Sequence, residues 1–309
     1  MKSKIYVIGS SNTDMVVKSN FLPKPGETVI GNTFLMNPGG KGANQAVSAC
    51  KLGADVTFIT KVGNDMFGKK AVNNFKKIGI KTDYISIDKN NSSGVAIIMV
   101  DKSGENSISV APGANNSLTI KDVNFIEEKL NADDYVLIQL EIPKTVVEYL
   151  IEICNKLKVK LILNPAPFQK ISDYHLSQVN TITPNEIETE YLSGIKVKDK
   201  ETAKKASEIL INKGIKNIII TMGEKGAFYK SSSFEGLIPT KKINVIDTTA
   251  AGDTFNGALV AGLSMNMDML TSIDFANNAA TYSVTKLGAQ SSAPSINDLN
   301  NKFLKYVHS

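Results

Sequence analysis

The chain alternates between short apolar runs and longer amphipathic runs along almost its whole length. The apolar runs are rich in β-branched residues and are expected to be strands: Ile5–Gly9, Val56–Val62, Tyr135–Leu140, Lys160–Asn164, Asn180–Thr183 and Asn217–Met222. The amphipathic runs have helical spacing and are expected to be helices: Gly42–Gly53, Met66–Gly79, Thr119–Leu130, Lys144–Leu157, Glu201–Lys213, Thr254–Met265 and Leu270–Lys286. Strands covered on both faces are apolar throughout, so this order predicts an α/β fold, a doubly wound, mostly parallel sheet with helices on both faces.

Two segments, residues 11–36 and 92–111, break the alternation. The first is extended and contains Pro23 and Pro25, and the second has the pattern of a hairpin with its turn at Ser103-Gly104. We expect both to form a small β-sheet lid within a single domain of residues 1–309; a hairpin without a function is the alternative. An exposed sheet needs covering, which predicts a homodimer formed through the lid.

Composition limits the classes of protein that the chain can belong to. Its 309 residues are 42% hydrophobic, which supports a large core. No apolar run approaches the roughly 18 residues of a membrane span, and the stretch at Met1–Gly9 is too short for a signal peptide. The two cysteines, Cys50 and Cys154, allow one bridge but no disulfide framework, so a cytoplasmic location is expected.

Charge and metal-binding residue types exclude further classes. The net charge is +5, but the lysines are dispersed, which argues against nucleic-acid binding and is consistent with small anionic substrates. With two histidines and two cysteines, a zinc site is not expected.

The segment Asp247–Phe255 carries the strongest candidate chemistry. A β-like run, Lys242–Ile246, precedes it and a helical pattern follows, so the small residues Ala250–Gly252 stand where a helix begins. A helix N-terminus offers unpaired N–H groups to an anion, and small residues permit close approach. The carboxylate of Asp253 adjoins this site, an arrangement suited to phosphoryl transfer to a hydroxyl group. The alternative is an aspartate cap beside a glycine-containing turn.

Two further glycine-rich segments also precede helices. Gly39–Asn44 could lay its backbone against a ligand, with the Asn44 amide as donor and acceptor, or it could be a plain tight turn. Gly63–Lys70 has the spacing of a phosphate loop, but Lys70 stands where Ser or Thr is needed for Mg²⁺. We therefore expect Gly63–Lys70 to be a turn that leads into an amphipathic helix.

Polar residues follow several of the expected strands. Asn12 and Asp14 come after the first strand and Glu141 after the third, where ligands bind in such sheets. Carboxylate and amide groups suit a polyol, although each residue alone could be a solvated loop residue. Asn185 and Glu188 share a face at a helix start, which is also compatible with an ordinary acidic helix start.

Another turn, Thr221–Gly226, follows a strongly apolar strand. It could approach a nucleotide or be a simple β-turn.

Together these motifs resemble the ribokinase family of carbohydrate kinases, of the phosphofructokinase-B type. Gly39–Asn44 is similar to the family's first signature, Asp247–Phe255 to its second and Asn185–Glu188 to its Asn-x-x-Glu element, and the resemblance runs from Ile5 to about Pro294. It implies a ribokinase-like fold and ATP-dependent phosphorylation of D-ribose at its 5-hydroxyl. The alternatives are a kinase for another sugar or nucleoside (deoxyribose, fructose or adenosine) and a non-catalytic sugar or nucleotide sensor.

The resemblance also implies a role for each matching residue. Asp253 would be the general base, and the anion hole would be formed by backbone N–H groups of Ala250, Ala251, Gly252 and Asp253. The sugar would be held by Asn12, Asp14, Gly40, Lys41, Asn44, Glu141 and Asp253. The ATP side would be lined by Asn185, Glu188, Thr221, Gly223, Gly226, Gly252 and Asn277, with Glu188 placing Mg²⁺ and its waters. An activating K⁺ ion would be bound, mostly through backbone carbonyls, at Asp247, Thr249, Ser283, Lys286, Gly288 and Ser292.

Overall fold

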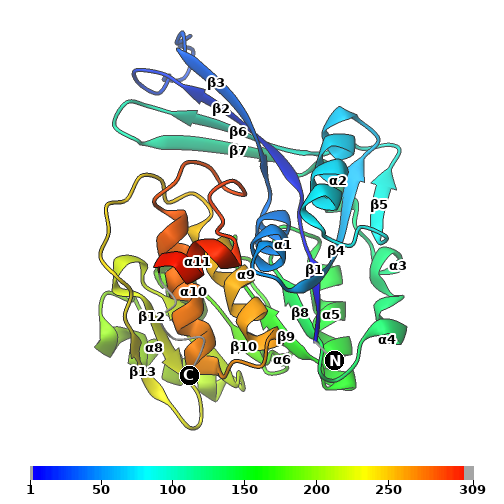
Figure 1. Cartoon of the computed structure of the whole chain (residues 1–309), viewed down its shortest axis with the longest axis vertical. Helices are drawn as coiled ribbons and strands as arrows, with labels where there is room; N and C mark the ends of the chain where they lie inside the picture. Colours follow the sequence, from blue (N-terminus) through cyan, green and yellow to red (C-terminus); the bar gives the residue numbers. More distant parts are fainter. Residues whose placement is uncertain (1–2, 303–309) are drawn as a thin grey trace.

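The computed structural model describes residues 3–302. The predicted domain, residues 1–309, begins and ends in residues that lie outside this part. Within residues 3–302 the main sheet has nine strands in the order β13-β12-β11-β10-β9-β8-β1-β4-β5 (Figure 1). Their bounds are β1 Lys4–Ile8, β4 Asp55–Gly63, β5 Ile85–Asp88, β8 Tyr135–Ile138, β9 Lys160–Leu163, β10 Thr181–Ile182, β11 Asn217–Thr221, β12 Ala227–Lys230 and β13 Glu235–Ile238.

The sheet is mostly parallel, as the sequence pattern predicts. Strand β1 pairs in parallel with both β4 and β8, and the parallel run continues to β5 on one side and to β11 on the other. Strands β12 and β13 are antiparallel and form one edge. The sequence analysis did not identify these two edge strands or β5.

Helices cover both faces of the sheet and form two separate cores (Figure 1). Successive residues of a strand point to opposite faces, so Tyr6 and Ile8 join one core while Ile5 and Val7 join the other. One face carries α3 Ile120–Val123, α4 Ile126–Lys129, α5 Lys144–Leu157, α6 Asp173–Leu176, α7 Glu186–Ser193 and α8 Lys200–Asn212. The other carries α1 Lys41–Lys51, α2 Met66–Ile78, α9 Ala251–Ser264, α10 Met269–Ser283 and α11 Ile296–Lys302.

The two predicted lid segments form a separate sheet. Its strands, in the order β3-β2-β6-β7, are β3 Thr33–Gly39, β2 Asn12–Lys18, β6 Gly94–Val100 and β7 Asn106–Ala111. The expected turn joins β6 to β7, where Gly104 has a φ of 88° and donates its N–H to the carbonyl of Asp101. Figure 1 shows this small sheet projecting from the main body. The prediction of a small second sheet is confirmed.

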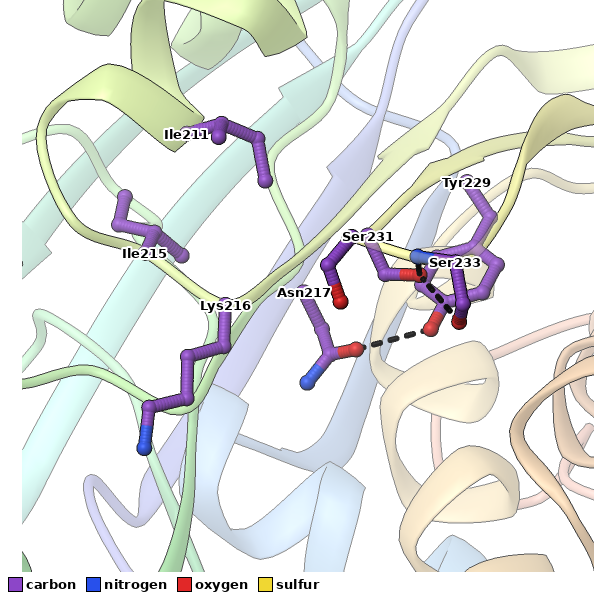
Figure 2. Close-up of a pocket in the computed structure, with 8 residues that line it drawn as sticks. Ile211, Ile215, Lys216, Asn217, Tyr229, Ser231 and Ser233 are labelled. Carbon is purple, nitrogen blue, oxygen red and sulfur yellow. Dashed lines mark hydrogen bonds between the residues drawn. The ribbon is translucent and has the colours of Figure 1, made fainter.

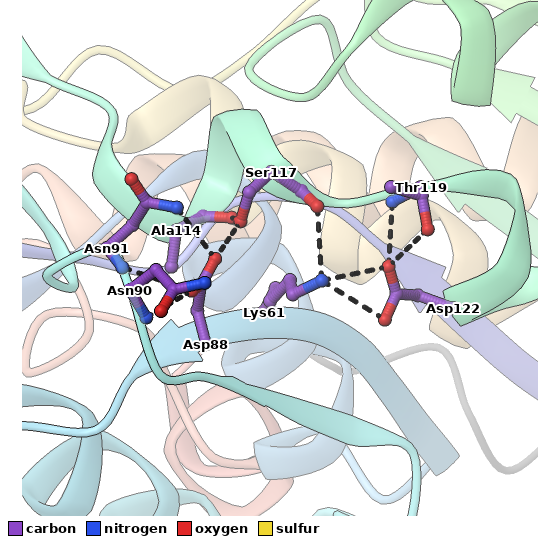
Figure 3. Close-up of polar contacts among 8 residues, drawn as sticks. All are labelled: Lys61, Asp88, Asn90, Asn91, Ala114, Ser117, Thr119 and Asp122. Carbon is purple, nitrogen blue, oxygen red and sulfur yellow. Dashed lines mark hydrogen bonds and ion pairs between the residues drawn. The ribbon is translucent and has the colours of Figure 1, made fainter.

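Polar contacts fasten the base of the β6–β7 hairpin to the main sheet (Figure 3). The Lys61 ammonium of β4 donates to the Asp122 carboxylate and to the Ser117 carbonyl, each at 3.1 Å. The Asp88 carboxylate accepts from the backbone and side-chain N–H groups of Asn91, each at 3.0 Å, and from the Ser117 hydroxyl. These hydrogen bonds lower the pKa of Asp88 below its usual value. The segment before β6 and the segment after β7 are therefore both hydrogen-bonded to residues of β4 or β5.

The prediction of a β-like run at Lys242–Ile246 is wrong. The segment is a loop, in which Val245 and Ile246 are exposed. The N–H of Ile246 donates to the carbonyl of Val284 at the end of α10, so the backbone pairs with a helix terminus instead of a strand. An alternating pattern favours a strand only where a neighbouring strand can complete the ladder.

The prediction of one helix at Thr119–Leu130 is also wrong, because the segment contains two short helices, α3 and α4. Within α4, Glu127 and Glu128 donate their N–H groups to the carbonyls of Asn124 and Phe125, three residues earlier, which interrupts the α-helical spacing. The break lets Phe125 stack on Tyr84, with the ring centroids 4.0 Å apart.

The segment Gly63–Lys70 forms the turn into α2, as predicted. Asp65 caps the helix by accepting the N–H of Gly68 at 2.8 Å, so a carboxylate occupies the place that a phosphate loop keeps for an anion. Cys50 and Cys154 are both free thiols. Among residues 3–302, every helix is too short or too polar to cross a membrane.

Candidate active site

A cavity of about 210 Å³ brings many of the predicted site residues together. Residues near the carboxyl ends of β9, β10 and β11 line it together with the N-terminus of α9, as expected for a parallel sheet. The predicted residues that line it are Lys41, Asn185, Glu188, Thr221, Ala250, Ala251, Gly252 and Asp253. The sequence analysis assigned no role to the remaining lining residues, Asn164, Ala166, Thr183, Thr248 and Asn256.

The N-terminus of α9 opens into this cavity. Ala250 caps the helix in the left-handed conformation, with φ 58° and ψ 20°, and α9 begins at Ala251, three residues before the predicted start. A Cβ added at Gly252 would meet no atom within 4 Å, so the backbone there faces open space. The N–H of Ala251 already donates to the Thr248 carbonyl at 3.2 Å, whereas Gly252 and Asp253 lie in the first turn, which lacks intrahelical acceptors. The N–H groups of Gly252 and Asp253 are therefore the main candidates for binding an anion.

Asp253 is buried and is held by two amide groups from α1. Its Oδ2 accepts from Nδ2 of Asn44 and its Oδ1 from Nε2 of Gln45, both at 2.9 Å. Oδ1 of Asn44 is buried and has no partner among the described residues, so it remains available to a ligand hydroxyl. The sequence analysis identified Asn44 but missed Gln45.

The glycine block before α1 owes its sequence to packing. Gly40 has a φ of 90°, and a Cβ there would lie 2.7 Å from the backbone nitrogen of Asn12. Glu141 then holds the start of α1, because its Oε2 accepts the N–H of Lys41 at 3.1 Å and the hydroxyl of Ser10 at 2.5 Å. Gly40 thus permits the loop to approach β2, and Glu141 joins α1 to the end of β1.

The Lys41 side chain lies among four carboxylates. Burial lowers its pKa, but Asp253, Glu141, Glu188 and Asp14 together raise the pKa above its usual value. The ammonium group therefore stays charged and offers positive charge beside the helix N-terminus.

Asp14 lies on β2, so the small sheet contributes directly to the site. Burial, together with the charges of Glu141 and Asp253, raises the pKa of Asp14 to about 6, and the charge of Lys41 partly opposes this rise. A carboxylate with this pKa ionises close to neutral pH and can then accept hydrogen bonds from a sugar.

Asn12 is held by a residue that the sequence analysis missed, Asn115. Nδ2 of Asn115 donates to Oδ1 of Asn12 at 2.7 Å, and Oδ1 of Asn115 accepts the N–H of Ser11 at 2.9 Å. Because the side-chain oxygen of Asn12 already accepts a hydrogen bond, the NH₂ group of Asn12 is the part of the amide that could donate to a ligand. Asn115 lies just after β7, so the two ends of the small sheet meet at this contact.

Asn185 and Glu188 form a reciprocal cap at the start of α7. Oδ1 of Asn185 accepts the Glu188 N–H at 2.8 Å, and Oε2 of Glu188 accepts the Asn185 N–H at 2.9 Å. Both residues also line the cavity, so the capping role and the site role coexist. Burial raises the pKa of Glu188, while the Asn185 N–H and Lys41 lower it and Asp253 raises it.

The donor groups of the site limit the metal ions that it can bind. Among residues 3–302 no group of three or more His, Cys, Asp and Glu side chains could form a metal cage. Glu188 and Asp253 nevertheless supply carboxylate oxygens to the same cavity. Mg²⁺ commonly binds through one or two carboxylates together with waters and substrate phosphates, and these residues fit that pattern.

Three predicted ATP-side residues lie outside the 210 Å³ cavity. Gly223 begins the short 3₁₀ turn Gly223–Lys225 between β11 and β12. Gly226 and Asn277 both lie against the carbonyl oxygen of Ile238. A Cβ atom added at Gly226 would lie 2.2 Å from that oxygen. Nδ2 of Asn277 donates a hydrogen bond to it at 3.0 Å. These contacts give Gly226 and Asn277 structural roles at the end of β13.

The predicted cation residues lie on two loops joined by Asp247, apart from Ser283, which is the last residue of α10. Its Oδ1 accepts the N–H of Thr249 at 2.9 Å and its Oδ2 accepts the N–H of Gly288 at 2.8 Å. Burial raises the pKa of Asp247, but these hydrogen bonds outweigh it and the pKa is lowered. Ser283 and Ser292 donate their hydroxyls to nearby carbonyls, and the Lys286 ammonium lies over the ring of Tyr282.

A second cavity, of about 360 Å³, lies elsewhere (Figure 2). It is lined by Asn217, the first residue of β11, whereas the last residue, Thr221, lines the first cavity. The Tyr229 hydroxyl donates to Oδ1 of Asn217 at 2.8 Å within it. The second cavity therefore lies at the opposite edge of the sheet and contains none of the predicted site residues.

Comparison with known proteins agrees with this geometry. Residues 2–296 match the model of the pfkB family of carbohydrate kinases. The chain belongs to the pfkB family. Among curated pfkB relatives, it is 44% identical to a ribokinase from Haemophilus influenzae, over 95% of this chain and 96% of that protein. It is 38% identical to a deoxyribokinase from Salmonella typhimurium, over 96% and 97% of the two chains.

Solved structures show the same relationship. The Arabidopsis thaliana ribokinase complexed with ribose and ATP has a TM-score of 0.89 at 29% identity, covering 98% of this chain and 100% of that one. A ribokinase from Thermotoga maritima has a TM-score of 0.87 at 37% identity, covering 97% and 98%. The chain is therefore a ribokinase-type sugar kinase, with the ribokinase-like fold that its motifs predict.

Proposed function

We propose that this protein transfers the γ-phosphoryl group of ATP to the 5-hydroxyl of D-ribose. The observation that carries the proposal is the position of Asp253, a buried carboxylate in the first turn of the helix whose N-terminus opens into the cavity. This pairing of a base with an anion site is what phosphoryl transfer to an alcohol requires. The 44% identical relative is a ribokinase, which supports ribose as the acceptor.

In the proposed reaction Asp253 accepts the proton of the sugar hydroxyl as its oxygen forms a bond to the γ-phosphorus. The bond between that phosphorus and the β–γ bridging oxygen breaks, ADP leaves, and the proton later passes from Asp253 to solvent. The N–H groups of Gly252 and Asp253 and the ammonium of Lys41 stabilise the charge on the transferring group. Asn12, Asp14, Asn44 and Glu141 orient the sugar.

The resemblance to ribokinases also implies two cations. Mg²⁺, held by nucleotide phosphates, waters and Glu188, supplies positive charge to the phosphate oxygens. K⁺ at the loops joined by Asp247, with Thr249, Ser283, Lys286, Gly288 and Ser292, supplies positive potential near the anion hole. The carboxylate of Asp247 and the surrounding backbone fit an oxygen-ligated monovalent ion.

Deoxyribose is the second candidate acceptor, because a relative at 38% identity is a deoxyribokinase. Asp14 favours ribose, since a carboxylate that accepts from two neighbouring hydroxyls is left partly unpaired by a sugar that lacks one of them.

The test is phosphoryl transfer from Mg·ATP, with and without K⁺, to D-ribose, 2-deoxyribose, fructose and adenosine. Preferential, K⁺-stimulated turnover of ribose is expected. A preference for another acceptor would overturn the assignment of ribose. Ligand-induced thermal stabilisation without any turnover would support a sensor instead.

A homodimer formed through the small sheet is also part of the proposal. Apolar side chains are exposed on its strands: Phe34, Leu35, Ile97, Ile108 and Val110. By the strand register, Leu35, Ile108 and Val110 share one face of this sheet, and Phe34 and Ile97 lie on the other. A second copy of this chain seated on the first face would cover Leu35, Ile108 and Val110.

A further inference from the structure

Buried amide side chains form a hydrogen-bonded chain that ends at the carboxylate of Asp253. Nε2 of Gln139 donates to Oε1 of Gln45 at 2.6 Å. Nε2 of Gln45 donates to Oδ1 of Asp253 at 2.9 Å and to Oδ1 of Asn164 at 3.0 Å. Gln45 and Gln139 are each 0% exposed, so water does not compete for these bonds. Four separate segments, α1, α9 and the loops after β8 and β9, meet in this network.

The direction of every hydrogen bond in the network is fixed by chemistry. A carboxylate only accepts, so Gln45 must present its NH₂ group to Asp253. Its oxygen then faces Gln139, which must donate. Nδ2 of Asn164 donates to the carbonyl of Thr183 at 3.1 Å, and a carbonyl also only accepts. The network therefore has one consistent arrangement while Asp253 is ionised.

The network continues to the backbone of the anion hole. The Thr183 hydroxyl donates to Oδ1 of Asn256 at 2.6 Å, and Nδ2 of Asn256 donates to the Gly252 carbonyl at 2.8 Å. The general base and the first turn of α9 are thus braced by the same set of buried polar groups. Oε1 of Gln139 is buried and has no partner among the described residues. Both ends of the Gln45 amide are hydrogen-bonded, however, and this restrains its orientation.

We propose that Gln45 is a positioning residue for the general base, and this inference rests on the proposed function of Asp253. Gln45 does not line the cavity, so it acts through the carboxylate and not on a substrate. With Asn44 on Oδ2 and Gln45 on Oδ1, both carboxylate oxygens are fixed in place. Gln139 in turn orients the Gln45 amide so that its NH₂ group meets Asp253.

Other charged groups also face Asp253. Lys41 of α1 attracts the Asp253 carboxylate, while Asp14 of β2 and Glu188 of α7 repel it. Glu141 acts on both Asp14 and Lys41. None of these four groups has a hydrogen bond to Gln45 among those in the described part of the chain, so a variant at Gln45 leaves their direct contacts in place.

The test compares Gln45→Met with Ser48→Ala. Methionine keeps the length of the side chain and removes the donor. Ser48 lies one turn further along α1 and donates to the Thr254 carbonyl of α9 at 3.1 Å, so its removal weakens the same helix pair without touching the carboxylate. For Gln45→Met we expect kcat to fall roughly 10- to 100-fold with KM for ribose nearly unchanged. Ser48→Ala should leave kcat nearly unchanged.

Gln139→Met supplies a second test that keeps Gln45 in place. It should lower kcat by a smaller factor, and the double variant should be no slower than Gln45→Met, because Gln139 acts only through Gln45. Independent, multiplicative losses in the double variant would overturn the proposal. So would an unchanged kcat in folded Gln45→Met, or, if that variant does not fold, in Gln139→Met. Absence of turnover in the wild-type protein would instead reject the proposed function.

Discussion

Replacing Asp14 with Asn should make the protein more stable at pH 8 and a poorer kinase for ribose. The reason is the pKa of Asp14, which burial and neighbouring carboxylates raise from 3.8 to about 6. Between those two values the folded protein keeps a proton that the unfolded chain has lost. Stability from this group therefore falls as pH rises through about 4 to 6 and is constant above.

The size of the effect follows from that shift. A rise of about two pKa units corresponds to about 3 kcal/mol of unfolding free energy, and partial exposure of Asp14 reduces this to about 1–3 kcal/mol. Asparagine carries no charge, so Asp14→Asn should recover this amount at pH 8 and nothing at pH 4. The same change should lower kcat/KM for ribose about 10- to 100-fold, because hydrogen bonds to a charged group are lost.

Urea unfolding followed by circular dichroism measures the difference, since the chain contains no tryptophan to report by fluorescence. Unfolding curves of the wild type and Asp14→Asn are compared at pH 4, 6 and 8 without ligand. Asp133→Asn, at an exposed carboxylate, is the control and should change little. A stability difference that stays constant across this pH range would refute the reasoning about Asp14.

Three further outcomes are expected. Asp253→Asn should lower kcat by roughly 10²–10⁴ in steady-state assays, and near-normal turnover would remove it from the role of base. Gly40→Ala should destabilise the fold by about 1–3 kcal/mol more than Gly53→Ala in urea unfolding, because both have a φ of 90° but only Gly40 is crowded; equal losses would contradict the crowding argument. Ile108→Lys should weaken the proposed dimer in analytical ultracentrifugation, whereas Tyr191→Lys, on α7, should not; unchanged dimerisation would place the interface elsewhere.

Local sequence signals predicted the parts of the site that are local in the chain. Small residues before Asp253 marked a helix start, and that start is where α9 opens into the cavity. Strand ends pointed to Asp14 and Glu141, and the structure brings the carboxylates of both near Lys41. Helix boundaries followed the apolar periodicity closely, as for Lys144–Leu157.

The residues that were missed depend on contacts between distant segments. Gln45 reaches Asp253 across 208 positions and Asn115 reaches Ser11 across 104, and neither pairing leaves a periodic pattern in the sequence. The glutamine next to Asn44 was a usable signal, since a fully buried amide needs a polar partner. The wrong prediction at Lys242–Ile246 also depends on distant segments, because in the described part of the chain no neighbouring strand lies beside this strand-like sequence to pair with it.

The position of strand β2 predicts that protein concentration and sugar binding influence each other. The strand carries Asn12 and Asp14 at its root and pairs along its length with β3 and β6. A second copy seated on the small sheet would restrain the same strand that carries two of the residues proposed to hold the sugar. If self-association strengthens sugar binding by a given factor, thermodynamic linkage requires that bound sugar strengthen self-association by the same factor. Dilution would therefore weaken the apparent affinity for the sugar, and saturating sugar would reverse the loss.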